Sequence, residues 1–155
     1  MGPYVYEAAV SPHLASRIEG APVNTAVVKN CFKKVSQKYE YITVEGSGGI
    51  LCPLCFDEAE IQLEDVIKEL GLSCLIVADA SLGTINAVGL TVFYMRAKNI
   101  PVKGIIFNRF HPGNAIEEDN LKMCEYITGV KVLARVGDGD TKLDMDIGTL
   151  ISLYE

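Results

Sequence analysis

The chain has 155 residues, of which 49% are hydrophobic and 22% charged, and its formal net charge is −6. This length and apolar content suit one domain with a buried core and argue against a disordered chain. The acidic balance disfavours a nucleic-acid-binding surface, and no apolar run is long enough to predict a membrane span. The N-terminal residues lack the basic and apolar regions of a signal peptide, so we expect a cytoplasmic protein.

The apolar spacing and the capping and stop residues predict alternating helices and strands. Asn24, for example, is a typical N-cap, and Gly71 and Asn99 are typical helix stops. In chain order, we predict helix 12–19, helix 24–38, strand 41–44, helix 60–70, strand 73–78, helix 84–98, strand 102–107, helix 117–127, strand 130–136, and one or two helical turns within 144–154.

Helices of this length between strands predict right-handed βαβ crossovers and a parallel sheet. Strand 73–78 is a continuous apolar run, as expected for a sheet that is covered on both faces. Ligands of open α/β sheets bind at the carboxyl ends of the strands. The residues that follow the strands are therefore the candidates for a single active site.

Glu45 directly follows the first predicted strand and precedes Gly46, Ser47, Gly48 and Gly49. A carboxylate in this place is well suited to hold a Mg²⁺ ion that serves a phosphate group. Glycines lack a Cβ atom and allow positive φ, so the backbone can come close to a substrate. The alternatives are an acid that caps a turn and a tight turn that binds nothing.

A second candidate is the turn between strand 73–78 and the following helix, which contains Gly83, Thr84, Ile85 and Asn86. A helix N-terminus offers free N–H donors and the positive end of a dipole, and so it can hold a carboxylate or a phosphate. Ser81 or Thr84 could equally be a simple N-cap residue.

Asn108 ends strand 102–107, and its amide can donate and accept hydrogen bonds at once, as a nucleobase edge requires. A plain strand-end turn would also accommodate it. Val136 and Gly137 begin a second flexible loop at a strand end, which could wrap around a base.

The five cysteines are an odd number in apolar segments, which indicates reduced thiols rather than a disulfide framework. Cys52 and Cys55 form a CxxC pair, but a zinc site would need two more ligands, and His13 and His111 are isolated in the sequence. A redox CxxC would be expected to open a helix, whereas this pair follows a glycine loop. We expect two thiols that fill space behind the loop, with a metal or redox role as the alternative.

The order and spacing of these motifs resemble the dethiobiotin synthetase family. The resemblance runs from Pro3 almost to the C-terminus, and it rests on SPH at 11–13, VEGSGG at 44–49, LGTIN at 82–86 and IFN at 106–108. It implies a three-layer αβα fold with a mainly parallel sheet, of the P-loop NTPase type. It also implies a homodimeric ligase of biotin biosynthesis, which uses ATP and Mg²⁺ to carboxylate 7,8-diaminononanoate and close the ring of dethiobiotin.

The resemblance also implies a role for each candidate residue. Glu45 would be catalytic as a Mg²⁺ ligand near the diamine. The loop of Gly46, Ser47, Gly48 and Gly49 would line the diamine and its carbamate. The helix start at Gly83, Thr84, Ile85 and Asn86 would hold the substrate carboxylate across the dimer interface, and Asn108, Val136 and Gly137 would meet adenine.

One part of the family pattern does not occur in these residues, namely the phosphate-cradling GxxxxGK[ST] loop. We therefore expect residues 1–155 to form a single dethiobiotin synthetase-like domain that lacks the N-terminal P-loop strand and helix. Three explanations stay open: a fragment or truncated product, a separate chain that supplies the P-loop half, and a non-catalytic binding or partner protein with the same fold. Another P-loop amidoligase or a ParA-like ATPase is a further alternative.

Overall fold

The computed structural model describes residues 2–57 and 59–155. The chain forms two compact units, Met1–Leu72 and Ser73–Glu155, and each is described by itself. None of the helices in the described ranges is long and apolar enough to cross a membrane.

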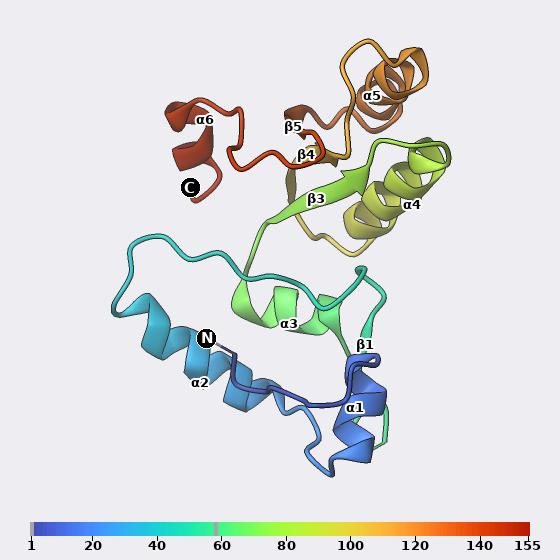
Figure 1. Ribbon diagram of the computed structural model, residues 1–155. Coiled ribbons are helices and arrows are strands. Elements are labelled where there is room, and N and C mark those ends of the chain that lie inside the picture. Colours follow the sequence, from blue (N-terminus) through green and yellow to red (C-terminus); the bar gives the residue numbers. More distant parts are fainter. Residues whose placement is uncertain (1, 58) are drawn as a thin grey trace. The chain divides into compact units, whose positions relative to one another are not determined.

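Unit 1 combines three helices with a short antiparallel pair of strands (Figure 1). The elements are α1 (Pro12–Ile18), α2 (Thr25–Ser36), β1 (Pro53–Cys55), β2 (Ile61–Gln62) and α3 (Leu63–Leu70). Pro12 opens α1 and the side chain of Asn24 caps α2 by accepting from the Ala26 N–H, as predicted. The β1–β2 pair, by contrast, was not predicted, and it shortens the expected helix 60–70 at its start.

The predicted strand 41–44 is wrong. Residues 41–44 have no regular secondary structure, and the side chains of Tyr41 and Val44 are 50% and 49% exposed. A strand forms only where its backbone N–H and C=O groups meet a neighbouring strand. The sheets in the described part of the chain are β1–β2 and β3–β4–β5, and neither includes this segment. Glu45 therefore follows an irregular segment rather than a strand.

Unit 2 is a three-stranded parallel sheet with the order β3–β4–β5. Its elements are β3 (Cys74–Asp79), α4 (Thr84–Ala97), β4 (Val102–Asn108), α5 (Ala115–Thr128), β5 (Val132–Val136) and α6 (Ile147–Ser152). The three strands predicted for this unit and the two long crossover helices form close to their predicted positions. Asn99 ends α4 with φ at +56°, a conformation that asparagine tolerates better than most residues.

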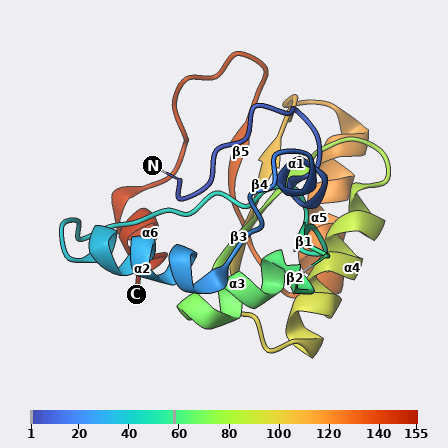
Figure 2. The ribbon, with the colours of Figure 1, turned by 90° about the horizontal axis from the view of Figure 1, so that it is seen from below.

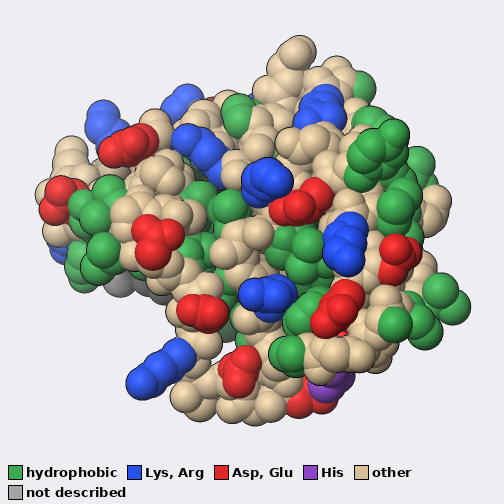
Figure 3. All heavy atoms as spheres, turned by 90° about the horizontal axis from the view of Figure 1, so that it is seen from above, with side chains coloured by type: hydrophobic (Ala, Val, Ile, Leu, Met, Phe, Trp, Pro, Cys, Tyr) green, Lys and Arg blue, Asp and Glu red, His purple; other side chains and the backbone are tan. Residues whose placement is uncertain are grey.

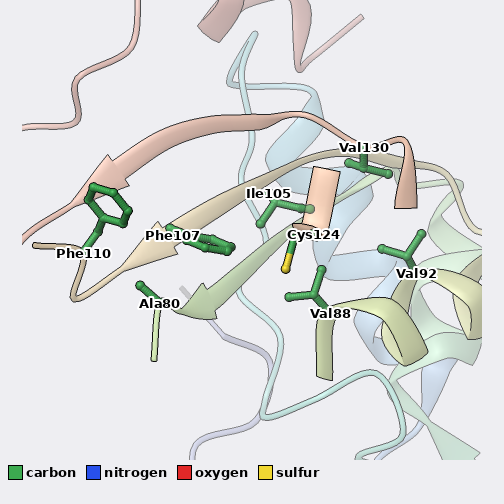
Figure 4. Close-up of a cluster of buried hydrophobic side chains, with 8 residues drawn as sticks. All are labelled: Ala80, Val88, Val92, Ile105, Phe107, Phe110, Cys124 and Val130. Carbon is green, nitrogen blue, oxygen red and sulfur yellow. The ribbon is translucent and has the colours of Figure 1, made fainter. Parts of the chain in front are cut away.

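Helices α4 and α5 pack on the same face of this sheet (Figures 1 and 2). The core between them is built from Ile105 and Phe107 of β4, which point toward Val88 of α4 and Cys124 of α5 (Figure 4). The exposed fractions of these four side chains are 1% or less. Because the three strands are parallel, the carboxyl ends of β3, β4 and β5 lie at the same edge of unit 2.

The outer strand β3 is apolar on both of its faces. Ile76 and Ala78 pack against the core, whereas Leu75 and Val77 alternate with them and are 37% and 65% exposed.

Acidic and basic side chains are interspersed on the face seen in Figure 3, and hydrophobic side chains reach the surface beside them.

Candidate functional site

The carboxyl edge of the unit 2 sheet brings the predicted strand-end residues together. The strand register pairs Asn108 with Asp79 of β3 on one side and with Val136 of β5 on the other. The Ala80 N–H donates to the Asn108 carbonyl oxygen at 3.0 Å. The predicted nucleotide residues Asn108, Val136 and Gly137 therefore lie on adjacent strand ends, and the side chain of Asn108 is exposed.

An open hollow of about 470 Å³ lies at the end of β3 and the start of α4. Gly83 and Thr84 line it, together with side chains of β3 and with Ala87, Val88 and Thr91 of α4. Ile85 and Asn86, the other two residues of the predicted carboxylate site, are not part of its lining. The hollow therefore reaches only the first half of that predicted site.

The start of α4 has the features of an anion-binding helix end. Gly83 is the N-cap residue, and its φ of +98° is a conformation that glycine adopts without strain. Glycine has no side chain to cap the first turn, although the Thr84 N–H donates to the Ser81 carbonyl oxygen at 3.2 Å. Thr84 is the first helical residue and is buried, so its alternative role as the N-cap is wrong.

Two buried or paired side chains hold this loop in place. Asp79 directly follows the predicted strand 73–78 and is one of the strand-end candidates, whereas the sequence analysis did not identify Asn120. Asn120 of α5, which is 4% exposed, donates from Nδ2 to the carbonyl oxygens of Ala80 (2.9 Å) and Ser81 (3.2 Å). Asp79 accepts from the Ser81 N–H at 2.8 Å and forms an ion pair with Arg109, whose φ is +54°. Asp79 was predicted as a strand-end candidate, whereas Arg109 was missed, and its place directly after Asn108 was the only signal for it in the sequence.

A third group missed by the sequence analysis surrounds His111, in the loop after β4. His111 Nδ1 lies 3.1 Å from Glu117 Oε1, and Nε2 lies 3.3 Å from Asp138 Oδ2. Hydrogen bonding to Glu117 and then to Asp138 raises the pKa of His111 above its ordinary value. The backbone N–H of His111 lowers the pKa of Glu117. A histidine that is isolated in the sequence is thus held by two carboxylates in the fold.

The Glu45 loop belongs to unit 1. Glu45 is exposed, and Gly46, Ser47, Gly48 and Gly49 form the turn after it. Gly48 has φ at +92°, and a Cβ on Gly46 would come within 2.9 Å of Leu63 Cδ2. The turn itself therefore favours glycine at 48, and a side chain at 46 would require the Leu63 side chain to move, whatever the loop binds.

The CxxC pair lies next to this turn. A Cβ on Gly48 would lie 3.5 Å from Cys52 Sγ, and the Cys52 N–H donates to the Gly49 carbonyl oxygen at 2.9 Å. Burial raises the pKa of Cys52, while Cys55 is 2% exposed, and neither residue forms a disulfide. Across residues 2–57 and 59–155, no three His, Cys, Asp or Glu side chains form a group that could hold a metal ion.

The fold and the positions of these residues define a class of protein. Helices and a parallel sheet with its candidate ligand residues at the carboxyl edge are the αβα architecture of P-loop NTPase-like proteins. A profile of the AAA domain family matches residues 1–140.

Three curated relatives give the comparison its detail. A protein of Brachyspira hyodysenteriae is 52% identical over 142 residues, which are 91% of this chain and 64% of the relative. A protein of Clostridium novyi is 48% identical over 135 residues (86% and 57%), and one of Clostridium botulinum is 39% identical over 152 residues (98% and 66%). All three are named ATP-dependent dethiobiotin synthetase BioD. The chain belongs to the dethiobiotin synthetase family of AAA-domain proteins, and it spans about three fifths of the length of these relatives.

Proposed function

We propose that this chain supplies the substrate and nucleobase side of an ATP- and Mg²⁺-dependent dethiobiotin synthetase of biotin biosynthesis. The observation that carries the proposal is the meeting of Asn108, Val136 and the Gly83 loop at one edge of a parallel sheet, in a chain whose relatives bear that enzyme's name. The reaction would carboxylate one amine of 7,8-diaminononanoate, phosphorylate the carbamate from ATP, and close the ring when the second amine displaces phosphate.

In this proposal the residues of unit 2 bind and orient. The uncapped N–H groups at the start of α4 would hold the carboxylate of the diamine substrate, with Gly83, Thr84, Ile85 and Asn86 as the binding segment. The proposal includes a homodimer, with this contact made across the dimer interface. The adenine of ATP would be held by Asn108, Val136 and Gly137.

The Glu45 loop of unit 1 would serve the reacting end of the substrate. Mg²⁺ is typically bound by one or two carboxylates together with substrate phosphates and waters, so a single exposed carboxylate such as Glu45 fits this ion. When bound, Mg²⁺ would neutralise charge on the phosphates. The backbone of Gly46, Ser47, Gly48 and Gly49 would line the diamine and the carbamate, and the open space beside Gly49 leaves room for a ligand there.

These 155 residues contain no GxxxxGK[ST] motif. They therefore do not supply the loop that would bind the phosphates of ATP. We propose that a P-loop-bearing half completes the site. The test is incorporation of labelled bicarbonate into dethiobiotin with Mg·ATP and diamine, with and without the P-loop-bearing portion of the Brachyspira relative. Product only after that portion is added supports the proposal, and no product together with no diamine binding contradicts it.

The missing motif also favours a second candidate, a non-catalytic partner protein that keeps the fold without the chemistry. Titration calorimetry separates the two functions. A synthetase half is expected to bind the diamine even without the P-loop portion, whereas a pure partner protein would give no heat with either diamine or Mg·ATP.

A further inference from the structure

His111 connects two loops that lie at the carboxyl edge of the unit 2 sheet. It belongs to the loop between β4 and α5, and its two ring nitrogens face carboxylates from two other segments: Glu117 in the first turn of α5 and Asp138 in the loop after β5. A neutral imidazole has one N–H donor, so only the imidazolium can donate to both carboxylates at once.

The two carboxylates differ in how firmly they are held. Glu117 accepts from the His111 backbone N–H at 2.5 Å and from Asn114 Nδ2 at 2.8 Å, and its side chain is 9% exposed. Asp138 is 68% exposed. Glu117 is therefore the fixed anchor, and when His111 loses a proton, the bond to Asp138 is the one we expect to break.

Asp138 is carried by a self-contained turn. Asp140 Oδ2 accepts from the Gly137 N–H at 2.7 Å, and the Asp140 N–H donates back to the Gly137 carbonyl oxygen at 3.3 Å. A bond to Asp138 thus holds the whole turn 137–140, including Gly137, which precedes Asp138 directly.

The charges around His111 favour its protonated form. The acidic groups on the surrounding segments are Glu117 and Glu118 of α5 and Asp138 and Asp140 of the turn. The cations are engaged elsewhere: Arg135 lies over the Phe110 ring, 5.6 Å from its centroid, and Arg109 pairs with Asp79.

We propose that His111 is a positioning residue, which as an imidazolium fastens the turn 137–140 to α5 and as a neutral ring releases it. This inference rests on the proposed function to the extent that Gly137 meets the adenine. Since the pKa of His111 is raised, the turn is held at low pH and is released as the pH rises through a midpoint above histidine's ordinary pKa of about 6.5. Binding of the base is then stronger below this midpoint than above it.

The first test is a pH titration of the full chain by NMR, in which the His111 ring and the Gly139 amide are followed together. We expect a common midpoint above about 6.5. Asp138→Asn should lower the His111 midpoint and uncouple Gly139 from it, while the charge-matched control Asp144→Asn should do neither. The variant His13→Gln removes the signal of the other histidine ring and so identifies the His111 signal. It should not alter the shared titration of His111 and Gly139. A Gly139 amide that ignores the His111 titration would overturn the proposal.

The second test uses adenosine, whose binding is measured by calorimetry on either side of the His111 midpoint. We expect several-fold weaker binding above the midpoint in the wild type and no such pH dependence in Asp138→Asn. Binding that is independent of pH, with the turn still titrating, would overturn the positioning role. No adenosine binding at any pH, with the turn still titrating, would leave the role of His111 intact and contradict the proposed nucleobase site instead.

Discussion

The buried amide of Asn120 on α5 donates to the backbone carbonyl oxygen of Ala80, the residue that follows β3, at 2.9 Å. The same Nδ2 atom donates to Ser81 at 3.2 Å. One side chain thereby joins the helix after β4 to the loop after β3. The shape of the Gly83 loop consequently depends on Asn120, a residue that is distant in sequence. Asn120 is not among the residues proposed to bind a ligand.

We expect Asn120→Leu to destabilise the chain by about 1–3 kcal/mol, because it leaves two carbonyl oxygens without their buried donor. Urea denaturation measures the loss. The matched control is Asp119→Leu on the exposed side of the same helix turn, where we expect little change. Equal stability of the Asn120 variant and the wild type would show that this hydrogen bond does not hold the loop.

Gly104 and Gly89 should respond to alanine in opposite directions. A Cβ on Gly104 would lie 2.6 Å from Leu133 Cγ, so Gly104→Ala is expected to cost about 1–3 kcal/mol. Leu133→Ala should relieve part of this cost in a double-mutant cycle. A Cβ on Gly89 in α4 would meet only Ile127 at 3.8 Å, and Gly89→Ala should stabilise the helix by about 0.5–1 kcal/mol. Urea midpoints that move in the same direction for both variants would contradict this packing.

Cys124 is expected to be the least reactive thiol of unit 2. Burial raises its pKa to about 11, and since only the thiolate is nucleophilic, very little reactive form exists at pH 8. A thiol reagent at that pH should label partly exposed Cys74 before Cys124, as read by mass spectrometry. Labelling of Cys124 should rise when urea unfolds the chain. Rapid labelling of Cys124 in the native chain would contradict its burial in the core.

Glu45→Gln should reduce Mg²⁺-dependent turnover of the reconstituted enzyme on the order of 10²-fold or more, since it removes a charge from the proposed metal site. Stability should hardly change, because Glu45 is exposed. The control is Glu40→Gln, another exposed acid of unit 1, which should retain activity. Full activity in the Glu45 variant would remove this residue from the proposed mechanism.

The sequence predicted those parts of the molecule that local patterns determine. Strand β3 and helix α4 are examples, because a continuous apolar run and a stop at Asn99 are local signals. The strand 41–44 failed because its composition favours a strand, whereas strand formation depends on a partner that lies elsewhere. The β1–β2 pair was missed because β1 is short and begins with Pro53, a residue that argues against a strand interior.

The same difference between local and distant signals separates the site residues that were predicted from those that were missed. Asn108 and Gly83 were found because strand ends and glycine turns can be recognised from neighbouring residues. His111, Asn120 and Arg109 were missed because each has a partner that lies 27 or more positions away, and no local pattern indicates such contacts. The residues that could bind a ligand were therefore easier to predict than the residues that hold them in position.

Strand β3 has practical consequences for anyone who purifies this chain. It is an outer strand in unit 2, and it contains neither the lysine nor the proline that usually keeps an edge from recruiting other strands; its register shift lies at its start, between Cys74 and Leu75. Its apolar residues Leu75 and Val77 are partly exposed beside that edge. Concentrated solutions should therefore self-associate through β3, and Val77→Lys is the change that would keep the protein dispersed without touching the core.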